Sequence, residues 1–272
     1  DDSAAKKALE EIRKAKATFL ADIEIKINEV SAEVRKATGA SVKEKMDILA
    51  EINTVREALK KNQLKSKTKT SIKIPDIGLE LIYVKEGEFK IGSPVSEVGR
   101  KPGEIQHSVK LTRPYWIGKY EVTQGQWVKV MGVNPSNWKD DNLPVETVDW
   151  TDCMSFCEKL TEIEKKAGRL PEGYEYRLPT ESEWEYAARG GHSSKGYLHS
   201  GSNKLDEVGW YRGNGNSKTH KPGDKKANEI GLFDMAGNVW EWCYDRYGNY
   251  PLTEVTDPSG PKTGVDRVGR GG

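Results

Sequence analysis

Cysteine is scarce in this chain of 272 residues, which contains only Cys153, Cys157 and Cys243. An odd count excludes a fully paired disulfide framework, and so few sulfur atoms exclude a disulfide-rich scaffold. Cys153 and Cys157 lie four residues apart on a predicted helix, but no nearby histidine or third cysteine completes a metal site. We interpret both as small residues that face the core.

Long apolar runs are also missing, and none approaches the roughly 18 residues that a membrane helix needs. A net charge of +1 gives no overall field that would favour nucleic acid or a membrane surface. The sequence begins at Asp1 with neither an initiating methionine nor a signal peptide. We therefore expect a processed or shortened product, possible export, and membrane attachment only through a lipid anchor upstream of Asp1.

Aromatic residues, proline and glycine are nearly absent from the first part of the chain. All eight Trp, all eleven Tyr and all twelve Pro lie beyond residue 74, as does every Gly except Gly39. Apolar residues recur at helical spacing over residues 1–61, and a Thr-Gly stop divides them, which predicts a helical hairpin. Such a hairpin is more typical of a stalk than of a specific binding surface. Residues 62–71 are polar and lysine-rich, as in a linker, and a compact domain is predicted over residues 72–272.

Short strands and turns are predicted in this second part. Residues 79–93 contain an apolar run, a glycine turn and then alternation, which predicts a β-hairpin. Residues 109–123 are typical of another strand pair. From about residue 190 the chain is rich in Gly and Asn and shows few regular patterns, and long irregular segments of this kind often carry function.

Two helices are predicted from their capping residues. Asp149 or Thr151 could cap a helix that runs to about Lys166. Thr180 and Glu183 form a capping box at the start of a second helix.

Five sequence strings in this part resemble one known family. They are YWIGKYEVTQGQW (115–127), LPVETVDWTDCMSFCEKL (143–160), YRLPTESEWEYAARGG (176–191), GLFDMAGNVWEW (231–242) and DRVGRGG (266–272). In this order they resemble the formylglycine-generating enzymes, also called sulfatase-modifying factors, over roughly residues 79–272. The resemblance implies an α+β fold of the C-type-lectin-like kind, with small sheets, two helices and much irregular structure. Fold alone does not establish function.

The resemblance also places the chemistry of that family. Its enzymes oxidise a sulfatase cysteine to formylglycine with a cysteine pair and copper, and the pair follows the segment matched here by residues 267–272. The sequence ends at Gly272. Cys157 matches a helix cysteine of the family, whereas Cys153 and Cys243 match no catalytic position. We therefore expect no catalytic residue and no copper, because both copper(I) binding and thiol oxidation need soft sulfur. The alternative is an oxidase whose catalytic cysteines lie in a missing C-terminal tail.

A second group with the same fold resembles the chain over the same motifs. These are the variable proteins of diversity-generating retroelements, including surface lipoproteins of spirochaetes. This resemblance implies a non-catalytic binding or display scaffold at the cell surface, with a hypervariable C-terminal surface by this hypothesis. The expected ligand is a protein or another macromolecule but not nucleic acid, contacted near Gly271, Gly272 and the loops after Trp210 and Trp242. A further alternative is an accessory domain that orients a partner, as in family members attached to kinases.

A calcium site is the most specific local prediction. Asp234 and Glu241 are carboxylates seven residues apart on a glycine-containing turn, and the carbonyls of Gly237 and Val239 could converge between them. Calcium takes six to eight oxygen ligands of both kinds, and the resembling enzymes bind it at these four positions. The alternative is that the carboxylates accept hydrogen bonds from backbone amides. A second calcium site of the family is doubtful, because the loop after Trp210 has no Asp at the required place.

Several other candidates receive structural interpretations. Glu181 and Glu185 share one helix face, but their aromatic neighbours indicate packing more than acid–base catalysis. Trp240 and Trp242 are expected to wall the core rather than to stack on a sugar. The four histidines show no ligand spacing.

Overall fold

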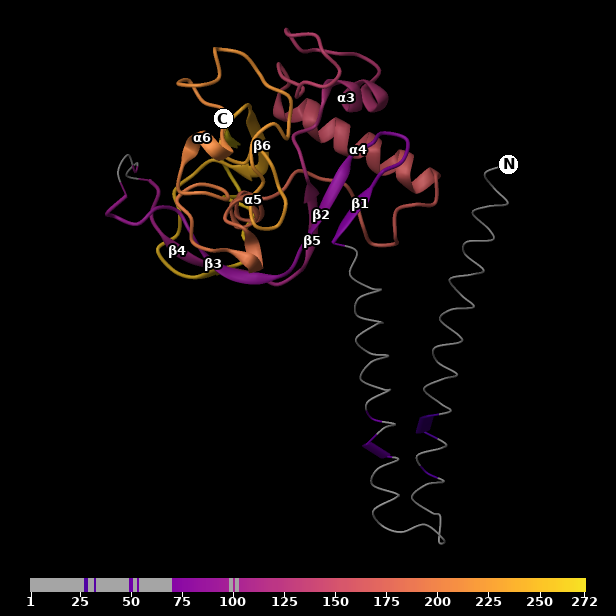
Figure 1. Ribbon diagram of the computed structural model, residues 1–272, viewed down its shortest axis with the longest axis vertical. Helices are drawn as coiled ribbons and strands as arrows, with labels where there is room; N and C mark the ends of the chain where they lie inside the picture. The colour runs from indigo at the N-terminus through magenta and orange to yellow at the C-terminus, as the bar shows by residue number, and fades with distance from the viewer. Residues whose placement is uncertain are drawn as a thin grey trace. The chain divides into compact units, whose positions relative to one another are not determined.

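The computed structural model describes residues 27–28, 32, 49–50, 53, 70–97, 100 and 103–272 (Figure 1). The chain divides into two units, Asp1–Lys69 and Thr70–Gly272. In the first unit every described residue is helical. Most of the predicted hairpin of residues 1–61 and most of the predicted linker 62–71 lie outside the described residues. No helix in the described part of the chain is both long and apolar enough to cross a membrane.

Two small three-stranded sheets form the start of the second unit. In the first, β2 (Glu80–Val84) lies between β1 (Ser71–Lys73) and β5 (Tyr115–Gly118), and both pairings are antiparallel. In the second, β4 (His107–Leu111) pairs antiparallel with β3 (Gly87–Ile91) and parallel with β7 (Val255–Thr256).

The predicted pairing of neighbouring strands is wrong in both places. Strands β2 and β3 do not form a hairpin over residues 79–93, and β4 and β5 do not pair over residues 109–123, because each pair is divided between the two sheets. The cause is that β2 is buried on both faces. Leu81 belongs to one apolar cluster, whereas Ile82 and Val84 belong to another. Because β2 lies between two cores, each of its edges is paired with a strand. Strand β1 pairs with one edge and β5 with the other.

Capping residues position the helices as predicted. Asp149 caps α4 (Trp150–Lys166), and Thr180 caps α5 (Glu181–Ala188) with a reciprocal capping box. The structure adds α3 (Gln124–Met131), which begins at a capping box of Thr123 and Gln126 that was not recognised in the sequence. Two short helices follow, the 3₁₀ helix η1 (Gly191–Ser193) and α6 (Leu205–Val208).

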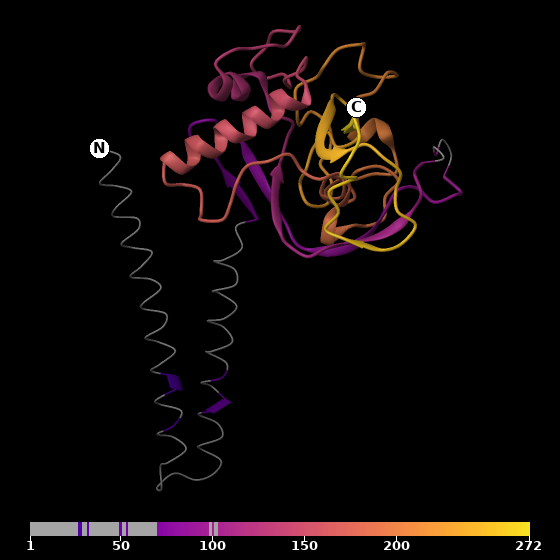
Figure 2. The same cartoon turned by 180° about the vertical axis from the view of Figure 1, so that it is seen from behind.

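The helices lie on opposite sides of the first sheet, α3 and α4 on one side and α5 on the other (Figures 1 and 2). Between α3 and α4 the rings of Trp127 and Phe156 stack, with centroids 5.0 Å apart and planes 7° apart. Both rings are buried with Leu160, which is 1% exposed. The apolar cluster that contains Leu81 therefore fixes α4 to β2. The cluster that contains Ile82 and Val84 fixes α5 to the rest of the unit.

Strands β6 (Trp240–Arg246) and β8 (Arg267–Gly271) form an antiparallel pair with an irregularity between Trp242 and Arg246. Few regular elements follow residue 190, as expected, but neither of these two strands was predicted. Strand β8 has the sequence RVGRG, and strand interiors seldom contain glycine, so propensity gave no signal.

An ionic network holds β8 to α5. The Arg270 guanidinium contacts Glu181 Oε1 at 3.1 Å and Glu185 Oε2 at 2.6 Å. Glu185 also pairs with Arg189 at 2.7 Å and accepts the Gly92 amide at 3.0 Å, which extends the network to the end of β3. Both glutamates therefore have structural partners, in agreement with the packing interpretation.

Asp245 joins this network from β6, where its Oδ2 accepts the Glu181 amide at 2.9 Å. The side chain is 4% exposed. Burial raises the pKa of Asp245 from 3.8 to about 6. In that interval the folded chain holds a proton that the unfolded chain has released, so the free energy of unfolding falls as pH rises from about 4 through 6.

We predict that Asp245→Asn removes this dependence. The stability of the variant relative to the native chain should rise by roughly 3 kcal/mol between pH 4 and pH 7, because the buried charge no longer forms. Urea denaturation across this range measures the difference, with the exposed Asp266→Asn as control. Parallel pH profiles for the native chain and Asp245→Asn would contradict the prediction.

Candidate functional site

The β6–β8 pair has one face toward the core and one toward solvent. Successive strand residues alternate between faces, and Cys243, Asp245 and Val268 are buried on the inner face. The opposite side, which we call the outer face, consists of Trp240, Trp242, Tyr244 and Arg246 from β6 and Arg267, Gly269 and Gly271 from β8.

Trp240 is 72% exposed, so the prediction that it walls the core is wrong. Its cross-strand partner is Gly271, and the partner of Trp242 is Gly269. Neither glycine carries a side chain that could cover an indole ring. Trp242 is half-buried, and its Nε1 donates to the Val148 carbonyl at 3.1 Å. The glycines of β8 are therefore the reason that an aromatic surface remains open.

The aromatic surface extends beyond the two strands. Trp150, the first residue of α4, donates from Nε1 to the Cys243 carbonyl at 2.9 Å. Its ring lies 6.3 Å from that of Tyr244, and the Arg267 guanidinium stacks over it at 3.5 Å. Tyr244 and Tyr247 are 41% and 67% exposed. Hydrogen bonds to backbone carbonyls thus hold Trp150 and Trp242, and stacking on Trp150 holds Arg267.

A buried turn precedes β6 and contains the residues predicted to bind calcium. Asp234 is 1% exposed and has a positive φ of 59°. Its Oδ2 accepts the Gly223 amide at 2.7 Å. In contrast, Asp234 Oδ1 and Glu241 Oε1 are buried without any hydrogen-bond partner. The alternative that backbone amides satisfy these carboxylates therefore holds for one oxygen of Asp234 but not for these two atoms.

Glu121 adds a third buried carboxylate that the sequence analysis missed. It accepts one hydrogen bond from the Val239 amide at 3.2 Å and another from the side-chain amide of Asn238. Burial raises its pKa well above the ordinary value, and the charges of Glu241 and Asp234 raise it further. No sequence spacing could reveal this contact, because Glu121 lies more than 100 residues before the turn.

Burial also raises the pKa of Glu241 to about 7 and raises that of Asp234. The Trp184 indole lies near Glu241, but its N–H makes no hydrogen bond of normal geometry. Each unpartnered carboxylate oxygen is costly in a site that water does not reach. A cation in this turn would supply the missing partner.

The fit to calcium depends on main-chain oxygen as well as carboxylates. Among the described residues no three His, Cys, Asp or Glu side chains are arranged to hold a metal ion. However, a side chain built on Gly271 would meet both the Val239 carbonyl, at 3.0 Å, and Glu241 Oε1, at 3.2 Å, so these two oxygens border one small space. Gly237 is tightly packed, since a Cβ there would lie 2.1 Å from the Trp210 carbonyl. Calcium binding by Asp234, Gly237, Val239 and Glu241 therefore stays a prediction. Carboxylate and carbonyl oxygens are donors of the kind that calcium takes.

The structure brings together most of the predicted ligand-contact segments. The Gly272 amide donates to the Val239 carbonyl at 3.1 Å, and the Asn238 amide donates to the Trp210 carbonyl at 2.8 Å. Gly272 and the segment at Trp210 therefore meet at the same turn. The chain after Trp242 is not a loop, because β6 continues to Arg246.

The loop after Trp210 packs around the indole of that residue. His220 stacks on the ring with centroids 3.8 Å apart, and Lys225 Nζ lies 3.9 Å from the ring centroid. Positively charged and aromatic side chains thus occupy the segment where the second calcium site was judged doubtful.

The three cysteines lie in environments that suppress thiol reactivity. All are free, with Cys153 and Cys157 on α4 and Cys243 on β6. Burial raises the pKa of both Cys153 and Cys157 to about 12 and raises that of Cys243 as well. The thiolate is the nucleophile and metal ligand, so these residues are not suited to either role near neutral pH.

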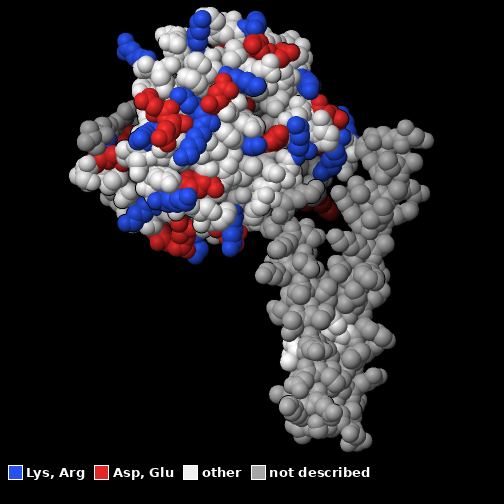
Figure 3. Space-filling view, viewed as in Figure 1, with Lys and Arg blue, Asp and Glu red and all other residues white. Residues whose placement is uncertain are grey.

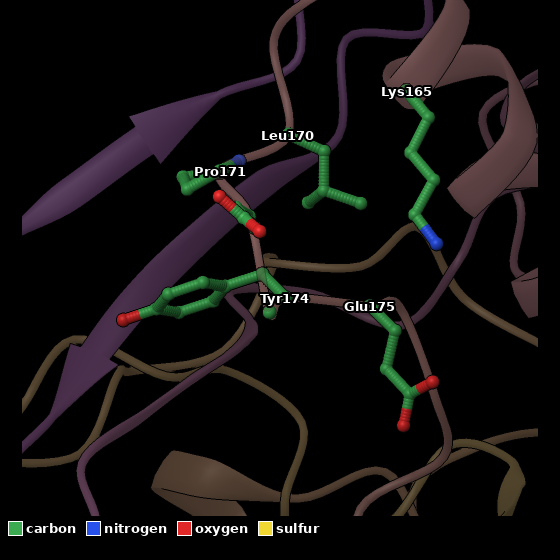
Figure 4. A pocket seen from close by; sticks show the side chains of 7 residues that line it. Lys165, Leu170, Pro171, Tyr174 and Glu175 are labelled. Atoms are coloured by element: carbon green, nitrogen blue, oxygen red, sulfur yellow. The ribbon is translucent and has the colours of Figure 1, made fainter.

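A hollow of roughly 390 Å³ lies at the C-terminal end of α4, away from the outer face (Figure 4). One short stretch of chain, residues 165 and 170–175, lines it. In Figure 4 the Tyr174 ring points away from Lys165 and Glu175. Ligand sites usually gather polar groups from several elements, so this hollow is a weak candidate.

Acidic and basic side chains are mixed over the face in Figure 3.

Comparison with known proteins identifies relatives of the second unit. The sulfatase-modifying factor enzyme 1-like domain matches residues 68–272. The chaperone protein LppX of Paenibacillus barcinonensis is 36% identical over 65% of this chain and 75% of its own length. The formylglycine-generating enzyme of Streptomyces coelicolor is 34% identical over 58% of this chain and 50% of its own length. The chain thus spans about half the length of that enzyme.

A solved structure supports the same relationship. Treponema denticola variable protein 1 superimposes with a TM-score of 0.63 at 30% identity, over 74% of this chain and 86% of its own. The predicted α+β, C-type-lectin-like fold of the formylglycine-generating-enzyme kind is confirmed. The chain therefore belongs to the family of sulfatase-modifying factor enzyme 1-like domains.

Proposed function

We propose that this chain is a non-catalytic binding scaffold whose outer face contacts a protein ligand. The observation that carries the proposal is the open aromatic surface of β6 and β8, in which Trp240 is 72% exposed opposite Gly271. Trp, Tyr and Arg are the residues that dominate binding energy at protein interfaces. Sites on regular strands are also held more precisely than sites on loops.

The relatives support this function. One solved relative is named a variable protein and one sequence relative a chaperone protein, and neither name denotes an oxidase. We further propose export to the cell surface or periplasm, where an exposed C-terminal surface would meet its ligand. We also propose that this surface is hypervariable in sequence and that a lipid anchor lies upstream of Asp1.

Selection of peptides tests the outer face. Peptides enriched from a random displayed library on the immobilised full chain should lose binding to Trp240→Ala/Tyr244→Ala. The matched control is Tyr174→Ala, which removes an aromatic ring of similar exposure, 53%, from the loop after α4. Peptides that bind both variants equally well, confirmed by interferometry on purified proteins, would contradict the proposal.

Calcium in the turn before β6 is part of the proposed function. Asp234 and Glu241 would hold the ion with the carbonyls of Gly237 and Val239, and the ion would neutralise the buried carboxylates. The two unpartnered buried oxygens support this assignment. The structural consequence would be a fixed path for the chain as it enters β6.

Calorimetric titration with calcium measures this binding. The native chain should release or absorb heat at a defined stoichiometry, whereas Glu241→Gln should show none, because it loses an anionic oxygen ligand. Glu254→Gln, an exposed acid elsewhere, serves as the control and should retain the native heat. Absence of binding in the native chain, or equal binding in Glu241→Gln, would remove the calcium proposal.

An alternative function is the oxidation of a sulfatase cysteine, which the 34% identity to the Streptomyces enzyme favours. It would need reactive cysteines beyond Gly272, because the three present are buried or partly buried and have raised pKa values.

We predict that this chain, incubated with copper and a sulfatase-derived cysteine peptide, leaves the peptide unchanged by mass spectrometry. A formylglycine-generating enzyme assayed in parallel provides the positive control. Formation of the aldehyde by this chain would refute the non-catalytic assignment.

A further inference from the structure

Two arginines of the outer face stand directly opposite each other. Arg246 of β6 and Arg267 of β8 are cross-strand partners. Like charges at directly opposed positions destabilise a strand pair. The proximity is also evident in the Arg267 guanidinium, because burial and then the Arg246 charge lower its pKa.

In the described part of the chain no carboxylate forms an ion pair with either arginine, and the buried Asp245 acts on Arg267 only through its charge. Each guanidinium donates to a neutral carbonyl, Arg246 to Gly264 and Arg267 to Tyr244 at 2.8 Å. The arginines that do form ion pairs in the described residues are Arg169, Arg177, Arg189 and Arg270. Asp245 is close in sequence but is buried on the inner face, where it accepts the Glu181 amide.

The surroundings of the pair are aromatic. Arg267 stacks on Trp150 at 3.5 Å. Tyr244, whose carbonyl accepts from Arg267, and Tyr247, which follows Arg246 in the sequence, are both exposed. A guanidinium held flat on an indole keeps its planar edge free for a carboxylate. Less water around the charges also strengthens an attraction to an anion.

We propose that the outer face binds an acidic peptide segment of a protein partner, whose carboxylates lie between Arg246 and Arg267. This inference rests on the proposed binding function and names the chemistry of its ligand. The charge of the ligand compensates the opposed arginines, and its neighbouring side chains pack on Trp150 and Trp240. A protein is favoured over a sulfated polysaccharide because the face combines Trp, Tyr and Arg in the manner of interface hot spots.

Fluorescence anisotropy with labelled hexaglutamate tests the inference on the full chain. We expect binding that weakens as sodium chloride is added, and roughly tenfold or greater loss of affinity in Arg246→Gln/Arg267→Gln. The matched control is Lys90→Gln/Arg113→Gln, which removes the same charge from two exposed positions near the second sheet. This control should bind hexaglutamate with an affinity within about twofold of the native value, because salt screens exposed charges that lie far from the ligand.

Several outcomes would overturn the inference. Equal losses in the two double variants would indicate attraction to net charge alone. Heparin binding that depends on Arg246 and Arg267, without hexaglutamate binding, would identify an anionic polysaccharide instead. The library selection separates this inference from the proposed function. Peptides that depend on Trp240 and Tyr244 but lack acidic residues would refute the acidic ligand and leave the binding function intact.

Discussion

The contact of Arg270 with Glu181 and Glu185 determines how the rest of the site is arranged. Because this arginine points inward from β8, alternation along the strand forces Arg267, Gly269 and Gly271 to face outward. A register slip of one residue would exchange the two faces and place a guanidinium where glycines now leave Trp240 open. A buried ion pair of this kind contributes little net stability, but its partners are costly to separate. Its structural effect is the choice of register.

The same network connects the outer face to the remainder of the fold. Glu185 contacts two arginines and the amide of Gly92, so α5, β8 and the end of β3 share one carboxylate. On β6, Asp245 anchors the strand to the first residue of α5. The aromatic surface is thus supported from beneath by elements that belong to one core cluster. Its side chains need little reordering when a ligand binds, which lowers the entropic cost of association.

The sequence predicted well what depends on local chemistry. Asp149 and Thr180 marked two helix starts, because a cap acts within four residues. Strand pairing was predicted incorrectly, because the double-sided burial of β2 follows from two cores that form only in the folded chain. The exposure of Trp240 was missed for a related reason: alternation shows that a residue faces one side, but not whether a partner strand covers that side. Glu121 had no detectable signal, since its contact with Val239 joins distant segments.

The distribution of unpartnered groups agrees with the proposed binding function. The three thiols have raised pKa values, and Glu181 and Glu185 are paired with Arg270. Two of the unpartnered buried oxygens and one exposed indole ring lie near the start of β6. Asp234 and Glu241 each have a buried carboxylate oxygen without a hydrogen-bond partner, while the Trp240 side chain is exposed to solvent on the outer face. Because Val239 and Trp240 are consecutive, a cation that fixed the Val239 carbonyl would also fix the direction of the Trp240 side chain. The proposed metal site and the proposed ligand face are therefore parts of one arrangement.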